Sequence, residues 1–307
     1  MKLKNNYNMF SEIKDYGAVF ETLVTKTADY LIQNNIKAQI LGISGGIDST
    51  VVAAICREVS DRTGIPLIGR SLPTKFNKNE ETTSAYLVGK AFCDDFEVYS
   101  MGDTYEEVEN SFSRYESKSP TPISSGNIQA RLRMIYLYNV ASLHKGIVID
   151  TDNLTEHNLG YWTVHGDVGD FNPIGGLWKT EVFKLAEYLI IRYNINREND
   201  KCLAVEKSYK LKPTAGLGIT NNDLEELGAE SYEQVDAILQ EILAWKSFKD
   251  PDLAFKSLEE EKLAFLDEQQ MLNYPMEVII AIAERHFKSE FKRKKSPVKV
   301  SRYLLTI

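Results

Sequence analysis

Apolar residues recur along the chain at two spacings, which predict helices alternating with short buried strands. Residues 16–34 are apolar at every third or fourth position, whereas residues 38–43 form a short and mostly apolar run. The same reading predicts strands at 38–43, 67–72, 96–99 and 146–150, and helices at 16–34, 51 onward, 80–92, 104–115, 127–144 and 179–194. This alternation is typical of a Rossmann-like α/β fold, in which helices cover both faces of a parallel sheet. Ligands of such folds bind at the carboxyl ends of the strands.

Two stretches have the composition of loops. Residues 117–127, SKSPTPISSGN, are rich in serine and proline, and residues 203–229 are rich in glycine, proline and polar residues. We expect the second, longer stretch to be a functional loop. Residues 231–290 carry helical patterns, and residues 291–307 form a basic tail. Since composition does not shift along the chain, we expect residues 1–307 to form a single domain.

The turn after the first predicted strand has the composition of a phosphate-binding loop. It reads LGISGGIDST from Leu41 to Thr50. Gly45 and Gly46 lack Cβ atoms, so the backbone can turn sharply and direct N–H groups towards phosphate oxygens at a helix N-terminus. Ser44 and Ser49 add hydroxyl donors. The simpler interpretation is a glycine turn followed by a helix cap.

An acidic residue in this turn indicates a metal ion. The lysine of a Walker A loop is missing, and Asp48 stands in the turn instead. A carboxylate repels phosphates unless a cation lies between them, so we expect Mg²⁺ to bridge Asp48 and a polyphosphate. Glu156 follows the strand at 146–150 and is expected on the same rim as a second metal carboxylate. The simpler interpretation of its segment, TDNLTE, is a helix cap with a glutamate in the first turn.

Composition excludes several classes of protein. The 307-residue chain has a net charge of −8, which argues against a general nucleic-acid or membrane surface. No apolar run approaches the length that spans a bilayer, and the N-terminal residues do not resemble a signal peptide. Cys56, Cys93 and Cys202 are widely spaced, which favours reduced thiols in a cytoplasmic protein.

Several motifs together carry a family resemblance. SGGIDS resembles the loop of the N-type ATP pyrophosphatases, and the ordered set between residues 38 and 240 resembles the NAD synthetases: SGGIDS, GNIQARLRM, TDNLTE, GYWTVHGD, LWKTEV, PTAGL and LEELG. The resemblance implies ATP-dependent amidation of deamido-NAD to NAD by ammonia. The reaction would proceed through an adenylate and release AMP and pyrophosphate.

The resemblance also implies roles for individual residues. Asp48, Lys179 and Thr214 would be catalytic, and Asp48 and Glu156 would bind Mg²⁺. The residues implied at the ATP site are Gly42, Ser44, Gly45, Gly46, Asp48, Ser49, Thr151, Lys179 and Thr214. Those implied at the deamido-NAD site are Arg131, Tyr138, Tyr161, Asp167 and Lys292, with Arg133 in a similar role. The simpler interpretations are a solvated Lys179 at a helix start, arginines on a solvated helix face and a core Tyr138.

The chain also departs from the family pattern. Asp150 stands where the family usually has glycine, which adds a carboxylate close to the phosphates. Phe291 stands where the family usually has a histidine, ahead of Lys292. These departures bear on dinucleotide recognition and on the metal site rather than on the use of ATP.

Alternatives remain at this stage. The loop by itself also fits a GMP synthetase-like enzyme, a tRNA-modifying ligase or a non-catalytic ATP-binding protein. Little more than thirty residues precede the nucleotide strand, so we expect no glutaminase-like domain and ammonia as the direct nitrogen donor. The helix at 127–144 is apolar around more than one face, which predicts a homodimer that shares the dinucleotide site. Coverage by C-terminal helices of the same chain is the alternative there.

Overall fold

A parallel four-stranded sheet in the order β3–β2–β1–β4 forms the centre of the protein. The strands are β1 (Gln39–Gly42), β2 (Leu67–Ser71), β3 (Asp95–Val98) and β4 (Ile147–Ile149). The computed structural model describes residues 12–115, 118–211, 223–248, 257–268 and 274–293. Gly42 is level with Arg70 of β2, and Leu41 is level with Ile149 of β4. Because the strands are parallel, the loops that follow β1, β2 and β4 share one rim, as predicted.

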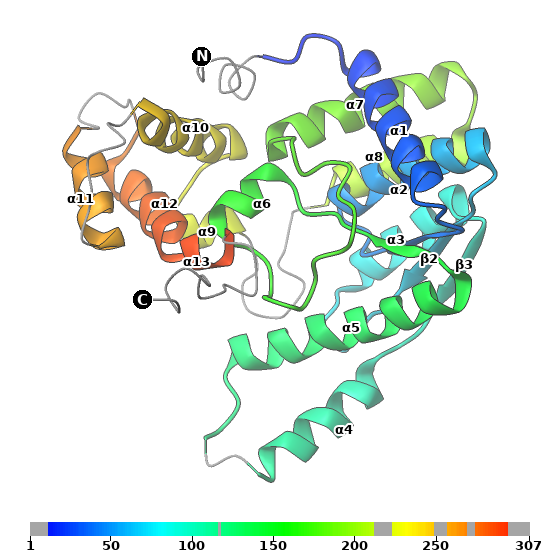
Figure 1. The fold of residues 1–307 in the computed structure, drawn as a ribbon, viewed down its shortest axis with the longest axis horizontal. Helices are drawn as coiled ribbons and strands as arrows, with labels where there is room; N and C mark the ends of the chain where they lie inside the picture. Colours follow the sequence, from blue (N-terminus) through cyan, green and yellow to red (C-terminus); the bar gives the residue numbers. More distant parts are fainter. Residues whose placement is uncertain (1–11, 116–117, 212–222, 249–256, 269–273, 294–307) are drawn as a thin grey trace, which may run out of the picture.

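Helices cover both faces of the sheet, as the alternating pattern predicted (Figure 1). Adjacent strand residues point to opposite faces, so Leu41 packs with one set of helices and Ile40 with the other. The first set comprises α1 (Tyr16–Gln33), α2 (Ile47–Thr63), α3 (Asn79–Phe92), α7 (Lys179–Ile195) and α8 (Asn199–Tyr209). The opposite face is covered by α5 (Pro122–His144), against which α4 (Gly102–Ser113) packs.

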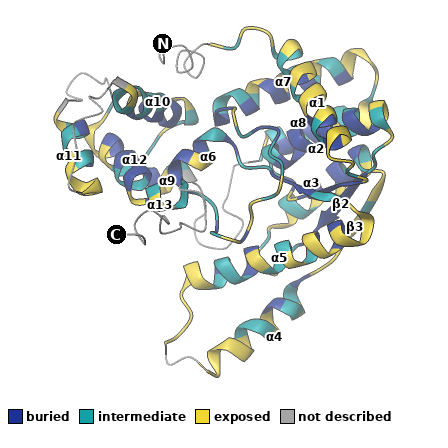
Figure 2. Ribbon diagram, viewed as in Figure 1, coloured by how far each residue is buried: buried dark blue, intermediate teal, exposed yellow. Residues whose placement is uncertain are grey.

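The C-terminal helices form a second hydrophobic cluster beside the sheet (Figure 1). They are α10 (Tyr232–Phe248), α11 (Leu258–Glu268) and α12 (Met276–Lys288), with the short α6 (Leu154–Leu159) and α9 (Asp223–Leu227) against them. The short α13 (Glu290–Arg293) packs on α12. α12 turns its apolar stripe, including Ile279, Ile282 and Phe287, inwards (Figure 2). Leu159 and Trp178 join this cluster, so it adjoins the rim where α6 and α7 begin. The single-domain interpretation stays a prediction.

Several helices begin or end away from the predicted boundaries. α5 begins at Pro122 inside the expected loop, because Thr121 accepts a hydrogen bond from the Ser124 N–H and proline suits the first helical position. α2 begins at Ile47, directly after Gly46. Most of α8, and α9, lie within residues 203–229, which were expected to form one long loop. α8 is helical because its apolar side packs against α3 and α7, a contact that composition does not reveal. Within the described ranges, no helix combines the length and apolar character needed to span a bilayer.

Candidate active site

The turn between β1 and α2 is built around two glycines with different tasks. Gly45 has φ +86°, and a Cβ atom there would lie 2.4 Å from the carbonyl oxygen of Glu81 on α3. Gly45 therefore lets α3 approach the turn, and the Ser84 hydroxyl donates to its carbonyl at 2.8 Å. Gly46 lines the cavity and precedes the first residue of α2. Of the three glycines predicted at the ATP site, Gly45 thus acts by packing, whereas Gly42 and Gly46 line the cavity.

Serine hydroxyls arrange this turn around the cavity. Ser44 Oγ and Ser49 Oγ lie 3.0 Å apart, and the Gly46 N–H donates to Ser44 Oγ at 3.2 Å. Gly42, Ser44 and Ser49 all line a cavity of about 490 Å³ at the rim of the sheet. Free N–H groups at the start of α2 and hydroxyls in the turn form a site suited to phosphate oxygens.

Lys179 is the first residue of α7, and its ammonium group lies between two carboxylates. Nζ is 2.5 Å from Asp48 Oδ2 and 3.1 Å from Glu156 Oε1. The residue is only 2% exposed, so the interpretation as a solvated surface lysine is wrong. Burial by itself lowers the pKa of Lys179, but the charges of Asp48 and Glu156 outweigh burial and hold the pKa well above its ordinary value. Lys179 is therefore a fixed cation in the cavity wall.

Glu156 combines both roles considered for its segment. Its backbone N–H donates to Asn153 Oδ1 at 3.0 Å and its Oε2 accepts from the Asn153 N–H at 3.2 Å, which is a capping box for α6. Its other oxygen faces Lys179 in the cavity. Burial raises the pKa of Glu156 to about 7, Lys179 opposes this rise and Asp48 adds to it. The Asn153 amide also donates to Asp48 Oδ1 at 2.9 Å, so Asn153 links the two carboxylates.

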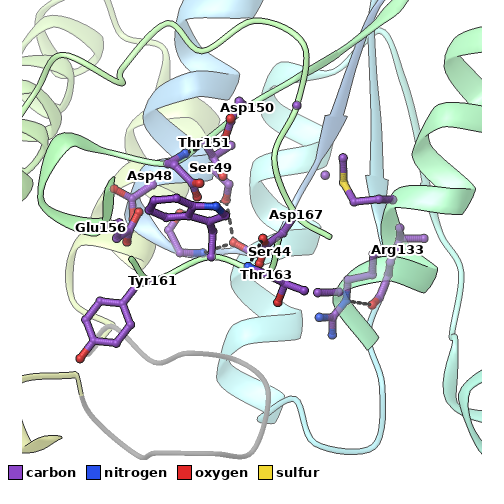
Figure 3. Close-up of a pocket in the computed structure, with 18 of the residues that line it drawn as sticks. Ser44, Asp48, Ser49, Arg133, Asp150, Thr151, Glu156, Tyr161, Thr163 and Asp167 are labelled. Carbon is purple, nitrogen blue, oxygen red and sulfur yellow. Dashed lines mark hydrogen bonds between the residues drawn. The ribbon is translucent and has the colours of Figure 1, made fainter. Parts of the chain in front are cut away.

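The carboxylates suit a magnesium ion that also binds phosphates. Asp48 and Glu156 lie beside each other at one end of the cavity (Figure 3). The described residues hold no cluster of three or more potential metal ligands of the His, Cys, Asp or Glu type. Mg²⁺ usually takes one or two protein carboxylates and completes its octahedron with water and substrate phosphates, so two carboxylates above a phosphate-binding turn fit it. The Lys179 ammonium pairs with both carboxylates and balances part of their charge.

More carboxylates follow β4. Asp150 lines the cavity, and its Oδ1 accepts from the Asp152 N–H at 2.9 Å. Burial raises the pKa of Asp150 against the opposing effect of backbone donors, and burial with the charge of Asp150 raises the pKa of Asp152. Thr151, implied at the ATP site, lies between these acids on the cavity wall (Figure 3). The carboxylate that replaces the family's usual glycine therefore does border the expected phosphate site.

The residues expected near deamido-NAD divide into two groups. Tyr161, Asp167 and Lys292 line the same cavity as Asp48. Asp167 accepts from the Thr163 N–H at 2.7 Å. Burial raises the pKa of Asp167 to about 6, although this hydrogen bond opposes the rise. Lys292 donates to the Gly160 carbonyl at 2.6 Å and forms no ion pair with a described carboxylate, while burial lowers its pKa. These residues bring one cation, one acid and an aromatic ring to the wall of the cavity.

Arg131 and Tyr138 do not line this cavity. The Arg131 guanidinium donates to the Val164 carbonyl at 3.0 Å, and the Tyr138 hydroxyl donates to Asp170 Oδ1 at 3.0 Å. Tyr138 is 39% exposed, so it is not a core residue. Their roles in substrate binding stay predictions, and they would require a substrate that extends beyond this cavity or a site shared between two subunits. Thr214 lies outside the described residues.

Arg133 does point into the cavity, opposite Asp48 (Figure 3). Its Nε donates to the Leu72 carbonyl at 3.1 Å and its Nη2 contacts Asn77 Oδ1 at 3.4 Å. Burial lowers the pKa of Arg133, and no described carboxylate forms an ion pair with it. A guanidinium in such surroundings is suited to an anionic ligand.

Sequence reasoning missed three residues that shape the site. Asn153 was visible in TDNLTE, but only the fold brings its amide to Asp48. Asp236 of α10 accepts from the Thr155 hydroxyl and from the Thr180 N–H at 3.0 Å, next to Lys179. Arg285 of α12 lines the cavity beside Tyr161. Asp236 and Arg285 come from helices for which the motifs gave no signal.

The chain is similar in sequence to known NAD synthases. The family model described as NAD synthase matches residues 19–296. NH3-dependent NAD+ synthetases from Mannheimia succiniciproducens and Wolinella succinogenes are each 33% identical, over 69% of this chain and 83% of the relative in the first case and 78% and 84% in the second.

Solved structures show the same fold. The NMN synthetase from Francisella tularensis is 26% identical with a TM-score of 0.70, covering 94% of this chain and all of that chain. The NH3-dependent NAD synthetase from Campylobacter jejuni is 21% identical with a TM-score of 0.63, with the same coverage of both chains.

Proposed function

The chain belongs to the NAD synthase family, and we propose that it amidates deamido-NAD to NAD with ammonia, using ATP and releasing AMP and pyrophosphate. The observation that carries this proposal is the Lys179 ammonium held between Asp48 and Glu156, directly beyond the phosphate-binding turn. A GMP synthetase-like enzyme, a tRNA-modifying ligase and a plain ATP-binding protein are not favoured, because the family match extends over residues 19–296.

The residues proposed to bind ATP come from the turn between β1 and α2 and from the loop after β4. Gly46, Ser44 and Ser49 direct donors to the phosphates, and Thr151 adds a hydroxyl from the loop after β4. Asp48 and Glu156 would hold Mg²⁺, which when bound neutralises phosphate charge and assists departure of pyrophosphate. Lys179 provides a second positive charge beside these carboxylates. As the bond to the departing pyrophosphate breaks, the Lys179 charge stabilises the negative charge that develops on the leaving group.

Lys292 and Arg133 contribute cations for the nucleotide substrate from different parts of the cavity wall. Lys292 donates to the Gly160 and Trp162 carbonyls, lies over the Trp162 ring and forms no ion pair with a described carboxylate, which suits the carboxylate of the nicotinic acid ring. Arg133 suits a phosphate of the nucleotide, because it lines the cavity and forms no direct ion pair with a described carboxylate, although the charges of Asp167 and Glu81 act on it. Tyr161 offers an aromatic ring for the pyridine. Because both sets of residues line one cavity, the substrate carboxylate would lie close to the α-phosphate of ATP when both are bound.

The reaction then needs two displacements. A carboxylate oxygen of deamido-NAD attacks the α-phosphorus, the bond to the bridging oxygen of the β-phosphate breaks, and pyrophosphate leaves. Ammonia next attacks the acyl carbon of the adenylate, the bond from that carbon to the AMP oxygen breaks, and the nitrogen loses a proton. Position and charge from the protein account for most of the acceleration in such a scheme.

We place the enzyme in the cytoplasm as a homodimer. Cys56, Cys93 and Cys202 are all free thiols, which accords with a reducing compartment. On α5, Ile135 is 67% and Leu143 is 73% exposed, so the described C-terminal helices of the same chain do not cover this apolar surface. An isologous contact between two α5 helices would bury it and would bring Arg131 and Tyr138 close to the partner's cavity.

A second candidate substrate is the mononucleotide of nicotinic acid. One solved relative covered over its full length is named an NMN synthetase. Arg131 and Tyr138, expected at the dinucleotide, lie outside the cavity of the single chain, whereas the pyridine end is within it. A mononucleotide would use that end without requiring contacts to an adenylyl half.

The test is to assay purified protein with ATP, Mg²⁺ and ammonium, measuring pyrophosphate and amide product with deamido-NAD, nicotinic acid mononucleotide or neither. We expect pyrophosphate release and NAD formation that depend on deamido-NAD. Release that ignores both nucleotides would overturn the proposal, and preference for the mononucleotide would favour the second candidate. Glutamine in place of ammonium is expected to give no product.

A further inference from the structure

The aromatic ring of Tyr161 is covered on one face by an arginine from a distant helix. The Arg285 guanidinium lies 4.2 Å from the centre of the Tyr161 ring. Arg285 belongs to α12, while Tyr161 follows α6, and these two helices pack together beside α9 (Figure 1). Both side chains border the cavity that also holds Asp48 and Lys292. The contact is therefore part of the wall of the candidate active site.

Glu226 of α9 ties the two side chains together. Its Oε1 accepts from Arg285 Nη1 at 2.9 Å, and its Oε2 accepts from the Tyr161 hydroxyl at 3.1 Å. Arg285 Nε also donates to the Leu159 carbonyl at 3.0 Å. Two hydrogen bonds on different sides of the guanidinium fix its plane, and a third fixes the far end of the tyrosine. The ring orientation is thus set from both ends.

This arrangement is better explained by orientation than by stability. The Arg285 and Glu226 side chains are 35% and 34% exposed, and a pair so open to water contributes little to the free energy of unfolding. A ring that is already held in place, however, loses little conformational entropy when an aromatic ligand binds against it, which favours binding. Arginine suits the task because its flat guanidinium can stack on a ring and donate from its edge at once, which a lysine ammonium cannot do.

We propose that Arg285 is a positioning residue for the nicotinic acid end of the substrate. It holds the Tyr161 ring, together with Glu226, as a flat wall against which the pyridine ring packs. This inference rests on the proposed function. It predicts that Arg285 affects the KM for the nicotinic acid nucleotide rather than the KM for ATP, because the described contacts of Arg285 are with Tyr161, Glu226 and the Leu159 carbonyl and not with the phosphate-binding turn.

The experiment compares steady-state kinetics of Arg285→Met, Arg285→Lys and a matched control, Lys288→Met. Lys288 lies on the same helix, is exposed and pairs with Glu284 on the surface. We expect Arg285→Met to raise the KM for deamido-NAD about tenfold, as loss of a stacked and hydrogen-bonded arginine would. The KM for ATP and kcat should stay within about twofold, a readout that general loss of structure would not leave untouched. Arg285→Lys should fall between wild type and Arg285→Met.

A double-variant comparison tests the route through Tyr161. Tyr161→Leu and Tyr161→Leu with Arg285→Met should have the same KM for deamido-NAD, because Arg285 acts only through the ring. Additive effects would overturn that route, and an Arg285→Met enzyme with the KM of the Lys288→Met control would overturn the inference alone. If wild type prefers the mononucleotide, the same KM is measured with it, since the pyridine end is shared. A wild type that amidates neither nucleotide overturns the proposed function and this inference with it.

Discussion

Nζ of Lys179 lies 2.5 Å from Oδ2 of Asp48, although 131 residues separate the two along the chain. Each residue stands in the first turn of its helix, Asp48 in α2 and Lys179 in α7. The two helix starts therefore meet at the rim of the sheet. The ion pair is almost fully enclosed on the lysine side, which makes it sensitive to the loss of either partner.

Replacing the lysine should remove catalysis. We expect Lys179→Met to lower kcat by about 100- to 1,000-fold, the usual effect of removing one group that stabilises developing charge. The control is Lys184→Met, which removes an exposed lysine from the same helix. Amide formation at saturating substrates is the measurement, and a Lys179→Met enzyme as active as the control would contradict the assigned role.

Replacing the aspartate tests the metal site. Asp48→Asn removes one anionic ligand at nearly constant volume, so we expect most turnover to be lost while the fold survives. Activity should be followed as Mg²⁺ is titrated, with circular dichroism as the check on folding. Unchanged turnover at limiting Mg²⁺ would count against Asp48 as a ligand.

Asp236 is expected to place Lys179 without touching substrate. Its carboxylate receives the Thr155 hydroxyl and the Thr180 N–H, and Thr155 Oγ1 in turn accepts from the Lys179 N–H at 2.8 Å. Asp236→Asn replaces one acceptor by an amide donor, so we expect kcat to fall about tenfold with little change in KM for ATP. Glu241→Gln, on the exposed side of the same helix, is the matched control. A kcat equal to that control would refute the positioning role.

His286 should make stability depend on pH. Burial, followed by the nearby charges of Arg293 and Lys246, lowers the pKa of His286 from 6.5 to about 3. Below pH 6.5 the unfolded chain binds a proton there that the folded protein does not, so acid favours unfolding. We expect a loss of about 1.4 kcal/mol per pH unit between pH 6 and pH 4 from this residue.

Urea unfolding at several pH values measures this effect. His286→Gln can still donate to the Asn158 carbonyl, as Nδ1 does at 3.0 Å, but cannot titrate. Its stability should therefore decline less steeply with acid than that of wild type. Parallel curves for the two proteins would show that His286 does not cause the pH dependence.

The dimer is best tested on α5 at a residue that serves no other purpose. Leu132 packs partly against the sheet, so a charge there would also disturb the core. Ile135 is exposed, and Ile135→Asp should dissociate the dimer at micromolar concentration, with loss of activity on deamido-NAD. Ile191→Asp, at an exposed position of α7, is the control. Sedimentation of wild type as a fully active monomer would refute the shared site.

Local pattern was sufficient for most of the sheet and for the phosphate-binding turn. The strands were predicted because short apolar runs, such as GIVI at the start of residues 146–150, are typical of buried strands in an α/β protein. The start of α5 was missed because PISSG resembles a loop, although Thr121 and Pro122 are good helix-starting residues. α8 was missed because its helix depends on packing against α3 and α7, which no short window of sequence contains.

The sequence by itself determined the α/β class, the turn from Gly42 to Ser49 and the chemical types gathered after β4, since these depend on residues close together in the chain. Only the tertiary structure decided which distant groups meet. It buries Lys179 between Asp48 and Glu156, sets Asp236 behind Lys179, and lays Arg285 on Tyr161. It also leaves Arg131 and Tyr138 outside the cavity that Arg133 enters. Such contacts follow from how helices pack over the rim, because the distance between two side chains is set by the fold and not by their separation along the chain.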